Sequence, residues 1–279
     1  VGSTPLSGRT LSAGRLLMRV KTQDGLSARV PLHLRPGESR IIELALPKSR
    51  DVPPGFLLVA GGRFIFGGDD AAPGAAPPRD LDISSFCITR QPVTWDEYFE
   101  FLEDLIAVGG DVTPHLPRTR SGPVVVVEDH LVRWRPGFEV PKSAPVRFVS
   151  LGDAYAYADW LGRRLGVSIR LPTEEEWEYA AGGVDGRPFA WGSRFVPGLA
   201  DTRRRGVRGP ASVHDFADDE SPFGMRSVSG GVREWTQSAA QELGRVLIKG
   251  GSFRAYPEQC RIGARATCAV DLTHQTIGI

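Results

Sequence analysis

Cysteine is scarce in this sequence, and long hydrophobic runs are missing. The 279 residues include three cysteines, a small and odd number that excludes a disulfide framework. No apolar run approaches the ~20 residues that a bilayer-spanning helix needs, and no signal peptide is visible. These absences predict no membrane segment in this chain and favour a cytoplasmic location.

An excess of charge of one sign is also missing. Lysine and arginine total 34 against 33 acidic residues, which leaves a net charge of +1. A chain with no global positive field is not expected to bind nucleic acid through its surface charge. The short arginine-rich stretch at residues 201–208 is interpreted as a solvated loop. The sequence therefore predicts no nucleic-acid partner.

The motifs of common enzyme chemistries are absent as well. There is no phosphate-binding P-loop, no dinucleotide fingerprint, no nucleophile–base pair and no pair of catalytic carboxylates. The histidines are isolated from one another, and no two have the i, i+4 spacing of a helical metal site; they are His33, His115, His130, His214 and His274. Few residues therefore remain as candidates for catalysis.

Glycine and proline are abundant, with 33 and 22 residues, and favour a loop-rich α+β protein. In the first 47 residues the apolar positions alternate as in short strands, at 15–20, 28–34 and 41–46. A proline-rich junction follows at residues 46–55. We therefore expect a small β-module over residues 1–50 and a larger domain over residues 51–279.

Turn and capping signals outline the larger domain. Two apolar runs around a Gly-Gly pair at residues 56–68 are typical of a β-hairpin. Residues 69–80 form a loop by composition, a strand is expected from residue 81, and the β-branched run at 124–127 indicates another hairpin. Three capping boxes each predict a helix start; they pair Thr94 with Glu97, Ser150 with Asp153, and Thr173 with Glu176.

Several aromatic and cysteine side chains are expected in the core. Large aromatic side chains dominate protein interiors, and a free cysteine behaves there as a small hydrophobe. We expect Trp160, Trp177 and Trp235 to be largely buried, with Trp235 near the functional pocket. Cys87 lies in a predicted strand and is interpreted as a buried hydrophobe.

Three motifs together resemble one protein family. They are RVLIKGGSFRAYPEQCRIGAR at residues 245–265, GVREWT at 231–236 and RLPTEEEWEYAAGG at 170–183. In this combination they are similar to the sulfatase-modifying-factor family, to which the formylglycine-generating enzyme belongs. The resemblance covers residue 53 to the end. It implies an α+β, C-type-lectin-like fold with short strands, few helices and many loops, and the preceding segment resembles a PEGA-type β-module.

The same resemblance indicates where oxidase chemistry would reside. In the formylglycine-generating enzyme two cysteines bind copper(I) as a thiolate pair, because copper(I) prefers soft sulfur ligands. Counted from the shared Gly-Gly-Ser-Phe run, the first falls on Ala255 and the second on Cys260. Alanine offers no donor atom, and Cys268 is in the wrong register to replace it. The sequence therefore argues against copper binding and against formylglycine formation.

Other positions of the family site are interpreted as scaffold. Ser252 and Trp235 match positions that line the pocket of the active enzymes, and both are also part of the general family scaffold. Arg261 and Arg265 are expected to hold loops through hydrogen bonds to carbonyl or carboxylate groups. With Ala255 and Cys260 in place of the cysteine pair, the site is degenerate.

Calcium is a second metal that the resemblance raises. The family often binds a structural calcium ion beside a G-N-V-x-E-W run, and here the run keeps Glu234 but has glycine in place of asparagine. Calcium requires hard oxygen ligands, so Glu234 stays a candidate ligand. The acidic loop at residues 214–224 either contributes further oxygens or is simply solvated.

Our leading hypothesis is a non-catalytic domain that binds a protein or small-molecule ligand. A β-module followed by such a domain resembles the C-terminal half of certain bacterial serine/threonine kinases. This predicts a longer parent protein with an upstream kinase domain, which agrees with a start at Val1 rather than methionine. The chain has no kinase motif of its own, so this expectation depends on architecture alone.

Two alternatives remain open. One is an oxidase of the formylglycine-generating type, built around Cys260. The other is the ligand-binding variable protein of a diversity-generating retroelement, because those proteins use the same scaffold and diversify exposed residues in this C-terminal stretch. The exposed set that would bind the ligand is Arg254, Tyr256, Glu258, Gln259 and Arg261.

Overall fold

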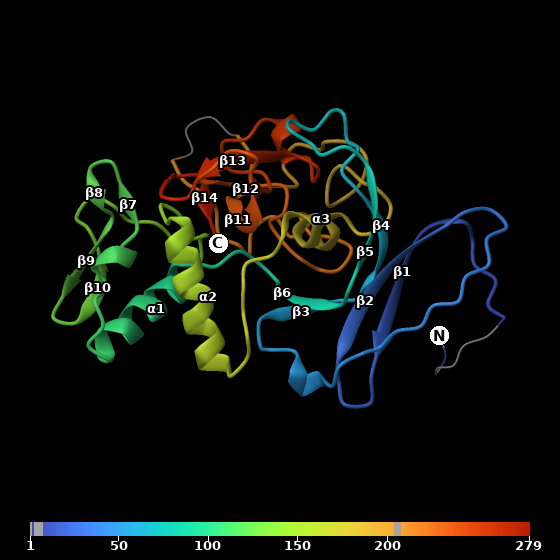
Figure 1. Ribbon diagram of the computed structural model, residues 1–279, viewed down its shortest axis with the longest axis horizontal. Helices are drawn as coiled ribbons and strands as arrows, with labels where there is room; N and C mark the ends of the chain where they lie inside the picture. The colour runs from blue at the N-terminus through green and yellow to red at the C-terminus, as the bar shows by residue number, and fades with distance from the viewer. Residues whose placement is uncertain (1, 3–7, 204–207) are drawn as a thin grey trace.

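The computed structural model describes residues 2, 8–203 and 208–279. Part of the arginine-rich stretch predicted as a solvated loop, residues 204–207, lies outside this range. Within the described range three α-helices and many short strands form an α+β fold, as expected (Figure 1). The helices are α1 (Trp95–Ala107), α2 (Leu151–Leu165) and α3 (Glu174–Gly182).

The N-terminal segment forms a hairpin that belongs to a larger sheet. Strands β1 (Gly14–Lys21) and β2 (Ser27–Leu34) pair antiparallel, as the alternating pattern predicts. The expected third strand at 41–46 is wrong, because this stretch is irregular and Ile41 is 89% exposed. The free edge of β2 is instead occupied by the parallel strand β3 (Phe56–Val59), so residues 41–46 have no β2 edge to join.

The expected hairpin at residues 56–68 is also wrong, although both of its strands exist. β3 pairs with β6 (Phe86–Thr89), and β4 (Gly62–Phe66) pairs with β5 (Arg79–Ile83). The Gly-Gly pair is therefore a bend inside one long hairpin rather than its turn. A Cβ on Gly61 would lie 2.5 Å from the carbonyl oxygen of Ile83, so only glycine allows this close approach.

All three predicted capping boxes are confirmed. The hydroxyl of each N-cap, Thr94, Ser150 or Thr173, accepts a hydrogen bond from the third helical residue, whose carboxylate accepts one from the N-cap backbone. Helix α2 ends on Gly166 in the left-handed conformation, at φ +68°. These boundaries are set by local hydrogen bonds, so the sequence specifies them.

A segment between α1 and α2 carries two small hairpins. The β-branched run predicted as a hairpin is confirmed as β9 (Val125–Glu128) paired with β10 (Leu131–Trp134). The shorter pair is β7 (Arg118–Thr119) with β8 (Gly122–Pro123). Trp134, the last residue of β10, packs against Trp95 of α1, with ring centroids 4.8 Å apart. This segment thereby extends the core around α1 rather than forming a separate lobe.

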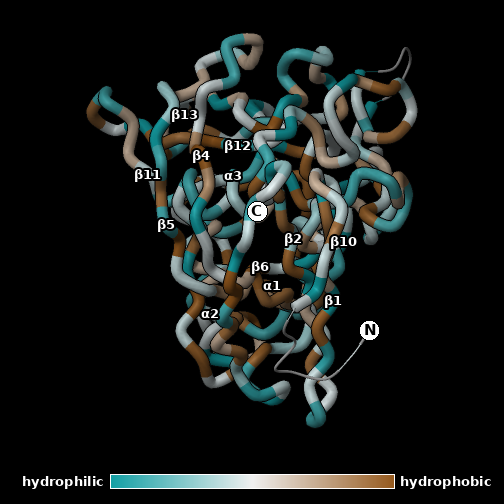
Figure 2. Tube along the Cα trace, turned by 90° about the vertical axis from the view of Figure 1, so that its right-hand side faces the viewer, coloured by the Kyte–Doolittle hydropathy of each residue, from teal (hydrophilic) through white to brown (hydrophobic). Residues whose placement is uncertain are grey.

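The C-terminal motifs fold into one four-stranded sheet. Its order is β13 (Arg265–Ala269), β12 (Arg245–Lys249), β11 (Arg233–Ala239) and β14 (Ile277–Gly278). Helix α2 lies between α1 and this sheet (Figure 1), and it contributes Leu151 and Ala154 to the core around Trp235. In both overall views β1 lies well away from β12 and β13 (Figures 1 and 2).

The predicted core tryptophans are confirmed. Trp160, Trp177 and Trp235 are 7%, 0% and 1% exposed. The indole N–H of Trp177 donates to the Glu234 carboxylate at 3.1 Å, and that of Trp235 donates to the Val149 carbonyl at 3.1 Å. The buried indole nitrogens of Trp177 and Trp235 therefore each have an acceptor, whereas Nε1 of the equally buried Trp95 has none among the described residues.

Candidate functional site

The Gly250-Gly251 turn brings the C-terminal segment against residues 229–231. Gly250 has φ +84°, and a Cβ on Gly251 would lie 2.0 Å from the Ser229 carbonyl oxygen. Beyond the turn, the Phe253 amide donates to the Gly231 carbonyl at 2.8 Å. The two glycines are thus required by backbone conformation and by close approach. They fix where residues 252–260 lie.

Cys260 is buried in an apolar environment. It ends the short 3₁₀ helix η3 (Pro257–Cys260), is 0% exposed and packs with Phe189 and Ala255. Its thiol donates to the Tyr256 carbonyl at 3.2 Å. Burial raises the pKa of Cys260 to about 12; Asp219 raises it further and Arg233 partly opposes this. The sulfur is therefore a protonated thiol at neutral pH rather than a thiolate.

The other positions of the degenerate site do not converge on an open pocket. Ala255 and Ser252 are buried, at 3% and 4% exposure. Cys268 lies on β13 in the cluster around Trp235, a different cluster from that of Cys260, and burial raises its pKa to about 11. Trp235 likewise contacts α2 and the sheet. Among the described residues, neither of two small pockets, one beside Asp219 and one beside Glu178, is lined by any of these side chains.

The five predicted ligand-contacting side chains divide into two groups. Arg254, Tyr256 and Glu258 are exposed. The Gln259 side-chain oxygen accepts a hydrogen bond from the Tyr256 amide at 3.0 Å. Arg261 makes two hydrogen bonds of 2.7 Å to the Asp69 carboxylate. The last two are thus engaged within the fold, and three remain directed to solvent.

The expected loop-holding roles of Arg261 and Arg265 are confirmed. Arg261 clamps Asp69, while Arg265 donates to the Gly74 carbonyl at 2.7 Å and to both oxygens of Glu174 at 2.8 and 2.9 Å. Bidentate arginine–carboxylate pairs hold geometry well. Together they fasten the tip of the β4–β5 hairpin to the C-terminal segment.

Two buried carboxylates lie beneath the site. Oε2 of Glu234 accepts from the Trp177 indole, and among the described residues its Oε1 has no hydrogen-bond partner. Asp219 accepts from the Ser229 amide with both oxygens at 3.0 Å. Burial raises the pKa of each to about 7, and the charge of Asp219 adds to the rise at Glu234. These carboxylates are unfavourable as charged groups unless a cation is near.

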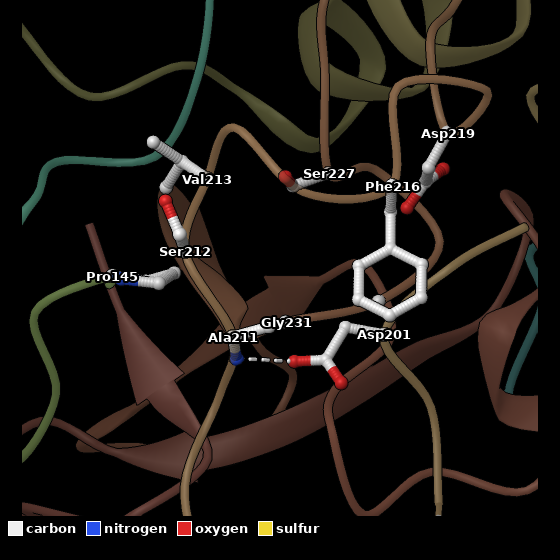
Figure 3. A pocket seen from close by; sticks show the side chains of 10 residues that line it. Pro145, Asp201, Ala211, Ser212, Val213, Phe216, Asp219, Ser227 and Gly231 are labelled. Carbon is white, nitrogen blue, oxygen red and sulfur yellow. Dashed lines mark hydrogen bonds between the residues drawn. The ribbon is translucent and has the colours of Figure 1, made fainter. Parts of the chain in front are cut away.

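A small pocket opens beside Asp219. Figure 3 shows the side chains of Asp201, Phe216 and Asp219 around it, and the Ala211 amide donates to Asp201 at 2.7 Å. In the part of the chain that the structure describes, no group of three or more His, Cys, Asp or Glu side chains could hold a metal ion. The predicted calcium ligand Glu234 does not line this pocket.

Reasoning from the sequence missed two buried ionisable residues near the site. Asp219 stands among several acids of a loop, and nothing in the pattern separates it from its solvated neighbours. Arg147 lies in the buried PVRFVS run and is 4% exposed. An isolated charged residue between apolar neighbours was the only available hint, since such residues are rarely fully buried without a partner.

The fold and the motif geometry define a formylglycine-generating-enzyme-like, C-type-lectin-like domain. The chain belongs to the sulfatase-modifying factor enzyme 1-like domain family, which matches residues 43–279. It is 32% identical over 236 residues to the inactive C-alpha-formylglycine-generating enzyme 2 of Mus musculus, covering 72% of this chain and 74% of that protein. It is also 31% identical over 280 residues to the formylglycine-generating enzyme of Thermomonospora curvata, covering 78% and 89%. The predicted family is confirmed.

A solved structure supports the fold class. Variable protein 1 of Treponema denticola superposes with a TM-score of 0.59 at 15% identity, covering 95% of this chain and 97% of that one. At this identity the likeness concerns the fold alone. None of the helices in the described residues has the length and apolar character needed to cross a bilayer. The α+β, C-type-lectin-like prediction is confirmed.

Proposed function

We propose that this domain is a non-catalytic binding domain on a formylglycine-generating-enzyme-like scaffold. The observation that carries the proposal is the state of Cys260, which is fully buried, hydrogen-bonded to the Tyr256 carbonyl and shifted to a pKa of about 12. Ala255 occupies the position where the family resemblance expects a second sulfur.

The residues present do not fit a copper(I) pair. Copper(I) needs deprotonated, soft sulfur ligands. Cys260 offers one sulfur whose thiolate is strongly disfavoured by burial, and Ala255 offers none. Cys268 packs in a different cluster. No oxidation step through copper is therefore derived for this chain.

The ligand surface that we propose is the exposed part of the C-terminal segment. Arg254, Tyr256 and Glu258 point to solvent. Arg203 stacks over the Tyr256 ring at 4.5 Å and donates to its hydroxyl at 2.5 Å, which holds that ring in place. Binding through such a surface suits a protein or small-molecule ligand, as a retroelement variable protein would also use it.

The wider context is part of the same proposal. A PEGA-like module at the N-terminus, an upstream bacterial serine/threonine kinase domain and a cytoplasmic location would together make this a sensor domain. The motifs of residues 1–50 and the domain order support that context by analogy. The division at residue 50 stays a prediction, because β2 pairs directly with β3 across it.

A calcium ion at Glu234 also remains a proposal. The buried Oε1 of Glu234 has no hydrogen-bond partner in the described part of the protein. An oxygen that coordinates a cation would lack such a partner in the same way. Calcium takes 6–8 oxygen ligands. Backbone carbonyls and water would have to complete the set, since the described acidic side chains do not gather around Glu234 in sufficient number.

Copper(I) titration tests the proposal directly. The reduced protein is titrated against a chromophoric copper(I) chelator and compared with Cys260→Ala, with Cys87→Ala on β6 as the matched control. We expect the wild type and Cys260→Ala to bind copper(I) equally weakly. Neither should convert a cysteine-containing peptide to formylglycine in air. Tight binding that only Cys260→Ala abolishes, or peptide conversion, would establish the oxidase alternative instead.

A further inference from the structure

Two guanidinium groups share one aromatic side chain beside the C-terminal segment. Cζ of Arg147 lies 5.7 Å from the centre of the Phe253 ring, and Cζ of Arg254 lies 5.4 Å from the same centre. Phe253 follows directly after the Gly-Gly turn and is 1% exposed. The fold therefore brings together two cations that are 107 residues apart in sequence.

Arg233 and His274 lie against the same region. The Arg233 amide donates to the Thr276 carbonyl at 2.8 Å, and Nδ1 of His274 is 2.8 Å from the Thr276 hydroxyl. The Phe148 amide, next to Arg147 in the chain, donates to the His274 carbonyl at 3.2 Å. Hydrogen bonds thus connect these segments to one another.

The charges of these residues act on one another. Partial desolvation lowers the pKa of His274, and the nearby Arg254, Arg120 and Arg233 lower it further. Burial lowers the pKa of Arg147 to about 10, with an added contribution from Arg254. The Arg118 amide donates to the Phe148 carbonyl at 3.0 Å, which brings the β7–β8 turn with Arg120 to the same segment. We name Arg120, Arg147, Arg233, Arg254 and His274 the arginine cluster. No carboxylate is among the charges that shift these two groups.

The arginine cluster has no counter-charge among the described residues. The ion pairs of the described chain include none of its four arginines, whereas the partly buried Arg29, Arg187, Arg261 and Arg265 each have a carboxylate partner. Bringing like charges together without compensation is unfavourable. An arrangement of this kind is expected where an anion completes the site, as in arginine clusters that recognise acidic groups.

Arg147 is the most deeply buried member of the arginine cluster. It is 4% exposed, and its Nε has no hydrogen-bond partner in the described structure. The rings of Phe138, Phe148 and Phe253 lie 5.7, 4.8 and 5.7 Å from its Cζ. Aromatic faces stabilise the charge of a guanidinium, but they satisfy its N–H donors poorly. A buried charged donor without an acceptor is costly.

The cluster extends from the interior to solvent. Arg147 is buried, Arg233 is half-buried, and Arg120, Arg254 and His274 are exposed. Gly209 closes one side, because a Cβ there would lie 2.8 Å from Nη2 of Arg147. A ligand can thus approach the exposed members while its charged group is attracted toward the buried one. The position of Arg254 links the cluster to the exposed C-terminal segment.

We propose that the arginine cluster binds a phosphate-type oxyanion carried by the domain's ligand. A doubly charged tetrahedral oxyanion has enough acceptor oxygens for several guanidinium groups, and arginine matches its geometry by paired N–H donors. A single carboxylate offers less charge to balance four arginines. This inference depends on the proposed binding function and names the chemical class of ligand for it.

The probe for the test is inorganic phosphate. Calorimetric titration of the whole chain at constant ionic strength is compared with acetate and chloride. We expect saturable phosphate binding, weakened tenfold or more by Arg254→Gln or Arg233→Gln, since each loses charge-assisted hydrogen bonds. Arg133→Gln on the β9–β10 hairpin removes the same charge elsewhere and should leave the affinity unchanged. Arg147→Met is a further variant, and Arg254→Gln serves if that chain does not fold.

The His274 ring gives an independent readout. A bound anion would offset the neighbouring arginines, so saturating phosphate should raise the pKa of His274 in an NMR titration, while chloride at equal ionic strength should not. Unsaturable binding, or binding that Arg254→Gln and Arg133→Gln weaken equally, would overturn the inference. Copper(I) binding at Cys260 with normal phosphate binding would instead overturn the proposed function while still supporting an anion site at the arginine cluster.

Discussion

At the scale of single residues, burial decides what each candidate group can do. Cysteine is a potentially reactive residue type, but burial raises the pKa of the Cys260 and Cys268 thiols. Burial raises the pKa of the Glu234 and Asp219 carboxyl groups. Arg147 remains a cation whose Nε has no acceptor in the part of the chain that the structure describes. The chemistry of this protein is therefore set by environment more than by residue identity.

We predict that Asp219→Asn stabilises the fold at pH 8. The folded pKa of Asp219 is about 7, above its ordinary value of 3.8, so the folded state holds a proton that the unfolded chain has released. Stability should consequently fall as pH rises from about 4 to about 7 and then level off. Asparagine can still accept from the Ser229 amide without a buried charge, and a gain of roughly 1–3 kcal/mol at pH 8 is expected.

Denaturant unfolding in EDTA at pH 5, 6, 7 and 8 measures this effect. Glu234, whose pKa is shifted in the same direction, should leave a residual slope in the Asp219→Asn variant. The exposed Asp218 next in sequence supplies the control, because Asp218→Asn should not change the slope. Stability that increases from pH 5 to 8, or an unchanged slope in Asp219→Asn, would contradict the assignment.

At the scale of elements, α3 joins the β4–β5 hairpin to the C-terminal sheet. Trp177 and Tyr179 lie in one core cluster with Phe64 and Phe66 of β4. On the same helix, Glu178 pairs with the fully buried Lys249 of β12 at 2.7 Å. Because α3 has contacts on both sides, a substitution in this helix should destabilise both the β4–β5 hairpin and the C-terminal sheet.

We predict that Trp177→Ala is strongly destabilising. The side chain is 0% exposed and its indole is the hydrogen-bond donor to Glu234, so truncation leaves both a cavity and a buried acid without its donor. A loss of about 3–5 kcal/mol is expected from the cavity. Thermal or denaturant unfolding measures it, with the partly exposed Trp191→Ala as the control that should lose less. An unchanged midpoint would show that the placement of α3 is wrong.

At the scale of the whole molecule, the N-terminal hairpin is joined to the larger domain by a shared sheet. Leu26 and Ala28 pack with Leu58, and Arg29 pairs with Val59 across the predicted boundary. The ion pair of Arg15 with Asp185, at 2.6 Å, crosses the same boundary. These contacts make the two parts physically dependent on one another.

We predict that residues 51–279 alone form a less stable and self-associating protein. Removal of the hairpin would expose Leu58 and Ala60 and leave β3 as an open edge, and such edges promote association. Thermal unfolding and sedimentation of this fragment, compared with the full chain, measure both effects. A fragment as stable and as monomeric as the full chain would instead support an independent domain boundary at residue 50.

The sequence by itself determined the family, the fold class, the helix starts and the buried tryptophans. Capping boxes at Thr94, Ser150 and Thr173 involve residues three apart, so neighbouring residues are enough to specify them. Ala255, at the position where the family resemblance expects the first catalytic cysteine, is likewise visible in the sequence alone. These features depend on local hydrogen bonds, on composition and on motif spacing.

Only the tertiary structure decided the strand partners and the charged sites. β3 and β4 looked like one hairpin, but each pairs with a strand farther along the chain. Arg147 and Arg254 meet at Phe253 because the Gly-Gly turn and the 145–149 segment converge in space. Such pairings bring together residues distant in sequence, and their energy depends on burial, which no short stretch of sequence specifies.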